Sequence, residues 1–278
     1  MNPADQAAAK VASAPLELRL SLSFCPAGQR SAQTALHAVY LELHEIPREV
    51  RDPGVADVKL RWWEEEIGLL YAGKARHPLT QTLQPHMPAL KGMDSLFRDL
   101  VLGTRMDIAG AGFASFEDVK RYCFRRYGAL AELSAALGEA HTEETRLAAR
   151  LLGNATCLAD ISAHGVAQAM HGRLRFAAED LKLHGVDRHI NGDTHGSAQV
   201  QALVQDYGDR ARAMRASALM GVPVSERTAL TVWRVRCALA LKRALKQERA
   251  GIAHAAEPVE LQPLSALFTA WRAARQSG

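Results

Sequence analysis

Ionisable and polar side chains recur four residues apart in two segments of this chain, a spacing that places them on one face of a helix. Carboxylates paired in this way can supply the hard oxygen ligands that Mg²⁺ requires. Within these segments, only Glu45 and Glu49 form a pair of carboxylates at this spacing. Further ligands for a metal ion would have to come from the other segment, so metal binding depends on how the two segments lie relative to each other. The first segment contains His44, Glu45, Arg48 and Glu49, and the second contains Asp160, His164 and Gln168.

The chain carries a net charge of +4 at pH 7. We expect its basic clusters to form solvated helix faces, with a surface for anionic lipid head groups as the alternative. No recognition motif for nucleic acid accompanies the charge, so nucleic acid is not an expected partner. The clusters are Arg121, Arg125 and Arg126, and a C-terminal run of Arg234, Arg236, Lys242, Arg243, Lys246 and Arg249.

The 278 residues are 48% hydrophobic, which is enough for a sizeable core. No uncharged apolar run is long enough to span a bilayer. The Ala-rich residues 1–16 predict a disordered N-terminal tail rather than a secretory signal. The four cysteines are widely spaced and indicate buried thiols in a reducing cytoplasm. They are Cys25, Cys123, Cys157 and Cys237.

Helical periodicity dominates the chain and strand signals are scarce. Asp52-Pro53 provides an N-cap and a first-turn proline, and Ser115 to Asp118 forms a capping box. We therefore predict a single all-α domain over residues 17–278. Its predicted helices cover about residues 31–43, 52–71, 115–137, 142–170, 196–219, 225–250 and 260–275.

Two runs of residues carry a family resemblance. Residues 52–79 contain Asp-Pro, Ala56, Lys-Leu, Trp62-Trp63, Glu66-Ile, Leu-Tyr, Gly73 and His77-Pro in the order found in the squalene/phytoene synthase family. Residues 171–186 resemble the family pattern that follows its second aspartate-rich motif. The resemblance implies an isoprenoid synthase-type bundle of helices around a central cavity. Active members condense two prenyl diphosphates with the help of Mg²⁺.

Aligned without insertions, the two aspartate-rich motifs of the family fall on residues 44–48 and 160–168. The four positions whose carboxylates hold the metals are here His44, Arg48, His164 and Gln168. Both motifs are thus degraded, and Arg48 brings a permanent positive charge to the place of a metal ion. Pro47 removes a backbone donor from the same segment.

Three arrangements of this cavity remain open. A displaced Mg²⁺ site could use Glu45, Glu49 and Asp160, although the two glutamates are rotated about 100° from the expected face. A transition-metal site could use Asp160 with the two histidines of the motif positions. In the third arrangement, which we favour, no cofactor binds, Asp160 pairs with Arg48, and the histidines are hydrogen-bonded fillers of a polar cavity.

The resemblance also implies a set of residues that line the substrate cavity. For Tyr122 and Gly128 we favour a packing role over a lining one, and for Arg173 a surface or capping position over contact with an anion. Trp62 and Trp63 are predicted to anchor the core. The implied lining residues are Tyr40, Glu45, Tyr122, Gly128, Asp160 and Arg173.

Two classes of function follow. In the first, the protein is a non-catalytic scaffold, assembly or lipid-binding factor, similar to the complex I assembly factor of the same family. Its partners would be an isoprenoid or other lipid, an anionic membrane surface or a client protein complex. We expect it in the cytoplasm, where it could also attach peripherally to the inner membrane. In the second, it is an active Mg²⁺-dependent prenyl transferase making a squalene- or phytoene-like product.

Overall fold

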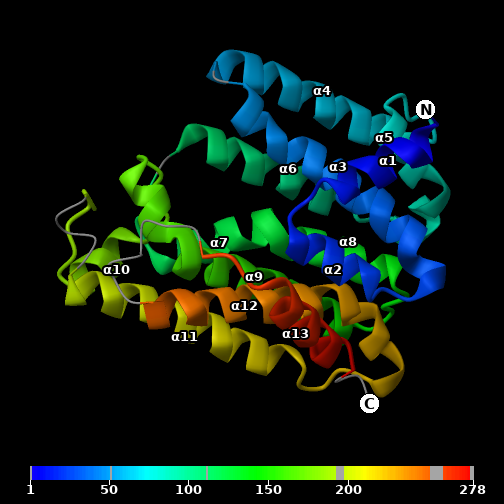
Figure 1. The fold of residues 1–278 in the computed structure, drawn as a ribbon. Coiled ribbons are helices and arrows are strands. Elements are labelled where there is room, and N and C mark those ends of the chain that lie inside the picture. Colours follow the sequence, from blue (N-terminus) through cyan, green and yellow to red (C-terminus); the bar gives the residue numbers. More distant parts are fainter. Residues whose placement is uncertain (1, 51, 111, 192–196, 251–258, 276–278) are drawn as a thin grey trace.

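The computed structural model describes residues 2–50, 52–110, 112–191, 197–250 and 259–275 (Figure 1). Helices make up most of these ranges. The only strand-like pairing within them is an isolated parallel bridge between Phe113 and Ala177. The predicted all-α fold is confirmed.

The helices follow one another with short connections. The N-terminal half contains α1 (Pro3–Ala12), α2 (Leu16–Ser23), α3 (Arg30–Glu49), α4 (Pro53–Tyr71), α5 (Pro78–Leu83), α6 (Asp94–Ala109), α7 (Phe116–Cys123) and α8 (Ala129–Leu137). The C-terminal half contains α9 (Glu143–Met170), α10 (Ala178–Leu183), α11 (Ala198–Ala218), α12 (Thr231–Ala250) and α13 (Pro263–Arg275).

The predicted caps form as expected. The Asp52 carboxylate accepts hydrogen bonds from the N–H groups of Gly54 and Val55 at 2.7 and 3.0 Å, which starts α4. The Ser115 capping box starts α7. The helix predicted from there to residue 137 is continuous in direction, but a π-helical turn, η3 (Phe124–Gly128), separates α7 from α8. Such turns insert one extra residue and re-aim the side chains around them.

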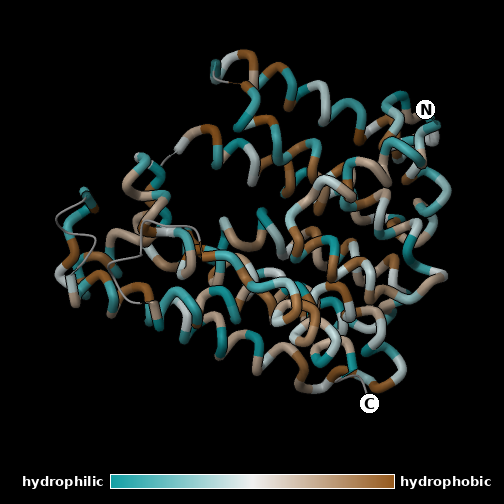
Figure 2. The backbone as a smooth tube through the Cα atoms, viewed as in Figure 1, coloured by the Kyte–Doolittle hydropathy of each residue, from teal (hydrophilic) through white to brown (hydrophobic). Residues whose placement is uncertain are grey.

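Helix α9 is the central element of the fold. It packs against α11, α12, α8 and η3. Figure 1 shows α3, α4 and α6 as a second group of helices on the other side of the molecule. Hydrophobic and hydrophilic residues alternate along the long helices in Figure 2, so each helix can turn an apolar face inward. No described helix is both long and apolar enough to cross a membrane.

The N-terminal segment differs from its prediction. Residues 1–16 were expected to be a disordered tail, but residues 3–12 form α1, which packs against α3 and α5. Ala7 and Val11 are buried at this contact. Lys10 reaches the carboxylates of Glu42 and Glu45 on α3, the first at 2.6 Å. Two small apolar residues and the two ion pairs of Lys10 therefore hold a segment whose composition alone predicts no structure.

Helix α4, which carries Trp62 and Trp63, also contains a buried carboxylate, Glu66. Glu66 is 1% exposed and accepts hydrogen bonds from the N–H groups of Arg76 and His77 and from the Thr80 hydroxyl, at 2.5–2.9 Å. It thereby fixes the turn that leads from α4 into α5. Trp63 is buried as predicted, whereas Trp62 is 44% exposed, so the prediction of a core anchor is wrong for that residue.

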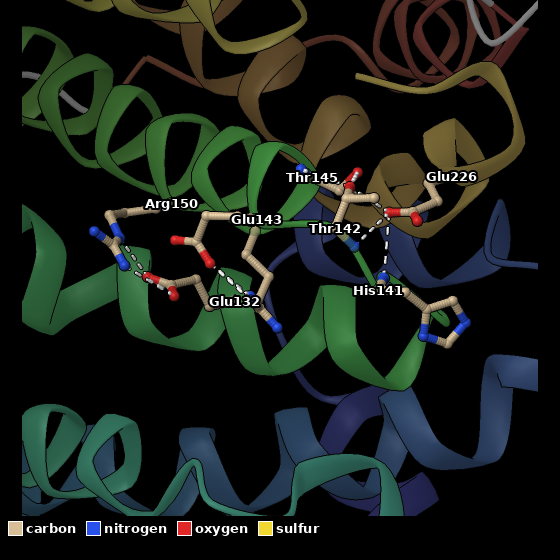
Figure 3. Close-up of polar contacts among 8 residues, drawn as sticks. Glu132, His141, Thr142, Glu143, Thr145, Arg150 and Glu226 are labelled. Atoms are coloured by element: carbon tan, nitrogen blue, oxygen red, sulfur yellow. Dashed lines mark hydrogen bonds and ion pairs between the residues drawn. The ribbon is translucent and has the colours of Figure 1, made fainter. Parts of the chain in front are cut away.

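The start of α9 is anchored by polar contacts (Figure 3). The Glu226 carboxylate accepts hydrogen bonds from the N–H groups of His141 and Thr142 and from the Thr142 hydroxyl, at 2.8–3.2 Å. About two turns further on, Arg150 forms an ion pair with the buried carboxylate of Glu132 on α8. These contacts fix the position of the helix that carries Asp160.

Candidate functional site

A cavity of about 680 Å³ opens between α2, α3, η3, α9 and α12. The four degraded motif positions all line it, together with five of the other candidate cavity and metal residues. Glu49 and Gly128 lie outside its lining. The nine lining residues are Tyr40, His44, Glu45, Arg48, Tyr122, Asp160, His164, Gln168 and Arg173.

Gly128 lies where the favoured packing role would place it, at a close contact between η3 and α9. A Cβ atom built on Gly128 would lie 2.5 Å from the Asn154 side chain of α9. A Cβ atom on Gly153 of α9 would lie 2.5 Å from the Tyr127 carbonyl oxygen. The two glycines therefore allow η3 and α9 to approach closely, which brings the side chains of η3 to the cavity.

His44 is held as a neutral side chain by an arginine. Its Nε2 lies 2.6 Å from Nη1 of Arg126, and its ring centroid lies 4.2 Å from that of Tyr40. Burial lowers the pKa of His44 well below its usual value, and the positive charges of Arg126, Arg236 and Arg48 act in the same direction. A guanidinium can only donate, so Nε2 of His44 accepts this bond.

His164, the histidine of the second motif, is likewise a neutral side chain in contact with an arginine. Nε2 of His164 lies 3.1 Å from Nη1 of Arg243, and burial lowers the pKa of His164. Arg243 also pairs with Asp160, at 3.4 Å, and with Glu17 of α2. The expected pair between Arg48 and Asp160 is therefore wrong. Arg48 lies at the exposed end of α3, which continues two residues past Pro47, and α12 brings a nearer cation to Asp160.

Asp107 is the hub of a third set of contacts. Its two carboxylate oxygens accept from Arg126 at 2.5 Å, from Arg175 at 2.6 Å and from the Tyr122 hydroxyl at 2.7 Å. The Asp107 side chain is 10% exposed and that of Arg175 is 5% exposed. This carboxylate is thus fully engaged with protein cations.

Arg236 lines the cavity without a comparable partner. It is 8% exposed, and its guanidinium carbon lies 4.4 Å from the ring centroid of Tyr127 and 4.8 Å from that of Trp233. No hydrogen-bond partner for its Nη1 lies among the residues that the structure describes. Arg234 is buried as well, so the prediction of solvated faces is wrong for this part of the basic run.

The residues present do not fit a divalent metal. No group of three or more His, Cys, Asp or Glu side chains that could hold a metal ion occurs in the described part of the chain. Glu45 is paired with Lys10, Glu49 lies 3.8 Å from Lys59, and Asp160 is paired with Arg243. The two metal sites that the sequence left open are therefore not assembled.

Several lining residues were missed or underrated in the sequence. Asp107 lies on α6, Arg126 on η3 and Arg175 in the connection between α9 and α10, and no local pattern links the three. A signal did exist on α12, where Arg236 and Arg243 lie seven residues apart and flank the apolar run Cys237–Leu241. Two arginines at this spacing share one face, and a charged pair on such a helix indicates a polar cavity. The four cysteines are buried and free, as predicted.

Comparison with known proteins gives the chain its relatives. A model of the squalene/phytoene synthase family matches residues 17–263. The chloroplastic phytoene synthase of Daucus carota is 25% identical over 161 residues, which cover 55% of this chain and 40% of the carrot protein. The phytoene synthase of Arthrospira platensis is 26% identical over 106 residues, covering 37% of this chain and 34% of that protein. The chain matches less than half the length of these relatives.

Solved structures share the whole architecture. A dehydrosqualene synthase crystallised with a ligand superimposes with a TM-score of 0.79 at 17% identity, over 99% of this chain and 95% of that one. The squalene synthase HpnC from Alicyclobacillus acidocaldarius superimposes with a TM-score of 0.66 at 19% identity, over 99% and 94% of the two chains. At these identities the likeness shows the fold alone.

Proposed function

The chain belongs to the squalene/phytoene synthase family, and we propose that it is a non-catalytic member that binds a lipid in its cavity. In this role it acts as a scaffold or assembly factor. The observation that carries the proposal is the pairing of each described cavity carboxylate with a protein cation. Glu45 pairs with Lys10, Asp107 with Arg126 and Arg175, and Glu17 and Asp160 with Arg243.

The physical argument concerns the metal. Mg²⁺ binds through hard oxygen ligands, and carboxylates supply most of its charge compensation. A carboxylate that already forms ion pairs with guanidinium groups would have to give them up, and the freed arginines would then repel the incoming metal. A cavity lined by arginines is suited to an anionic ligand and poorly suited to a dication.

A turnover assay tests the proposal. With farnesyl or geranylgeranyl diphosphate and either Mg²⁺ or Mn²⁺, the purified protein is expected to release no diphosphate above background. A family member with intact aspartate motifs serves as the positive control in the same buffer. Mg²⁺-dependent release at about 0.1 s⁻¹ or faster, within the lower reach of ordinary enzyme rates, would establish the alternative of an active prenyl transferase.

We also propose that α13 attaches the protein to an anionic membrane. This helix packs its alanines, such as Ala266 and Ala270, against α12 and turns its large apolar side chains outward. Phe268 and Trp271 are 61% and 41% exposed, with their rings stacked at 5.8 Å. Arginines on the same helix are exposed beside them and favour anionic lipids over neutral ones. Because α13 also contacts α2, which lines the cavity, attachment would bring the cavity near the bilayer.

Vesicle flotation checks this attachment. The double variant Phe268→Ser/Trp271→Ser is expected to lower recovery with anionic vesicles at least about tenfold, since two large apolar side chains no longer enter the interface. The matched control is Val55→Ser/Val58→Ser, which removes two exposed apolar side chains from α4. Equal recovery on neutral and anionic vesicles, or equal loss in both double variants, would contradict the assignment to α13.

A further inference from the structure

The cavity opens to solvent at a mouth that carries three arginines. Seven arginines and four carboxylates line the cavity. Three of these arginines are exposed, whereas the other four are buried or half-buried. Lining residues that reach solvent lie at an opening, so the exposed three mark the rim of the mouth. These rim arginines are Arg19 of α2, Arg48 at the end of α3 and Arg173 in the connection between α9 and α10.

The rim arginines have no carboxylate partner within the described residues. Each described carboxylate of the cavity is already paired with a deeper arginine or, for Glu45, with Lys10. Glu49, which follows Arg48 in the sequence, lies 3.8 Å from Lys59. The rim of the mouth therefore has three uncompensated positive charges that are available to an anionic surface.

Helix α2 connects this mouth to α13. Its Leu16, Leu20 and Phe24 side chains pack against the cluster that contains the buried alanines of α13. Figure 1 shows the two helices next to each other. Arg19 lies on the same helix and is exposed. Packed helices lie about 8–10 Å apart, so a bilayer in contact with α13 would lie within about one helix diameter of Arg19.

We propose that the mouth of the cavity docks against an anionic bilayer, with the rim arginines in contact with the lipid head groups. Each arginine near a surface of anionic lipids is attracted to it, and the attraction adds up over the three residues. An acidic protein segment offers the same charge, but only a bilayer also accounts for the exposed apolar face of the neighbouring helix α13.

This orientation has a consequence for a lipid ligand. A lipid that enters the cavity from the bilayer through a docked mouth keeps its apolar chain out of water, whose contact with each methylene is unfavourable. The passage of a lipid rests on the proposed function, whereas the docking of the mouth does not.

Vesicle flotation of the full-length protein tests the charges. The triple variant Arg19→Gln/Arg48→Gln/Arg173→Gln is expected to weaken association with anionic vesicles about 10- to 100-fold at low ionic strength, because three attracted charges are lost. The difference between the wild type and the triple variant should shrink as salt is added.

The matched control removes three arginines that pair within their own helices. Arg61→Gln/Arg98→Gln/Arg146→Gln lowers the net charge equally at positions that do not line the cavity. It should change association less than about threefold, as screened charges away from the contact do.

A fluorescent label tests the orientation of the mouth. The four native cysteines are buried, so an introduced exposed cysteine reacts selectively with a thiol-reactive dye. Ser13 is exposed and lines the cavity, whereas Ser95 is exposed on α6 and does not line it. On anionic vesicles, a dye on Ser13→Cys should shift its emission to the blue and be quenched by lipid-borne quenchers. A dye on Ser95→Cys should show neither change.

Several outcomes would overturn the docking. They are equal association of the triple variant and its control, an equal response of the two labels, and no association with anionic vesicles at all. Binding of a hexaglutamate peptide without any response of the Ser13→Cys label to vesicles would assign the rim arginines to an acidic protein partner. A purely structural role would lower the melting temperature of the triple variant without changing its association, and that result also contradicts the docking.

The label separates the docking from the other proposals. If the triple variant does not fold, the Ser13→Cys label decides alone, since it leaves all three rim arginines in place. Metal-dependent turnover of prenyl diphosphates together with a responding label would overturn the proposed function and leave the docking standing. Absence of turnover together with an unresponsive label would overturn the docking alone.

Discussion

Replacing Asp107 by asparagine is expected to destabilise the protein by about 3–5 kcal/mol, the usual cost of removing one partner from a buried ion pair. The carboxylate binds Arg126, Arg175 and the Tyr122 hydroxyl at 2.5–2.7 Å. Without its charge, two guanidinium groups would face each other in a largely buried wall of the cavity. Urea unfolding of the two proteins measures the loss.

The matched control is Asp94→Asn, which removes the partner of Arg98 from an exposed pair within α6. That change should cost at most about 1 kcal/mol, as is typical of surface pairs. The double variant Asp107→Asn/Arg175→Met should recover part of the loss, because one of the uncompensated charges is gone. A cost for Asp107→Asn no greater than that of the control would show that water and anions screen the arginines of this cavity.

Acid is expected to destabilise the protein through His37. This residue is fully buried on α3, and its ring lies 2.8 Å from the Gln33 carbonyl oxygen. Burial, and then the charge of Arg236, lower its pKa from 6.5 to about 3. Below pH 6.5 the unfolded chain binds a proton that the folded protein excludes. Keeping His37 neutral in the folded protein therefore costs no stability above pH 6.5. As the pH falls from 6.5 toward 3, it lowers the free energy of unfolding progressively.

At pH 5 the loss from this one histidine is about 2 kcal/mol, since each pH unit below the unfolded pKa costs about 1.4 kcal/mol. The free energy of unfolding, measured from pH 7.5 to pH 4.5, should fall less steeply for His37→Gln than for the wild type. His189→Gln, at a side chain that is 95% exposed, should leave the slope unchanged. Parallel wild-type and His37→Gln curves would mean that the folded protein takes up the proton. The lowered pKa values of His44 and His164 act in the same direction.

The polar contacts in the cavity bear on both classes of function, the non-catalytic lipid-binding factor and the active prenyl transferase. Its carboxylates are bound to arginines or, for Glu45, to a lysine, and its histidines accept hydrogen bonds from arginines. This arrangement leaves no set of ligands for a metal in the described part of the chain, whereas the rim arginines stay available to an anionic surface. We therefore expect the turnover and vesicle experiments to give opposite results, the first negative and the second positive.

The sequence by itself determined the helices and the grouping of the motif residues. Helical period and caps fix which residues share a face, so His44 and Arg48, and His164 and Gln168, could be placed in pairs on one face each. The family pattern then placed the two pairs around a cavity, and the structure brings all four to its lining. The buried carboxylate of the Trp-Trp pattern, Glu66, also performs a local task, within 14 residues of its partners.

Only the tertiary structure decided which charges pair. Asp160 meets Arg243, which lies 83 residues away, and Asp107 meets Arg175, which lies 68 residues away. These partners depend on how packed helices are rotated against one another, and a local pattern carries no such information. For the same reason the Ala-rich residues 3–12 looked unstructured until α3 and α5 offered a surface. Arg236 looked solvated because composition shows its charge, whereas its burial against Tyr127 and Trp233 arises from helix packing.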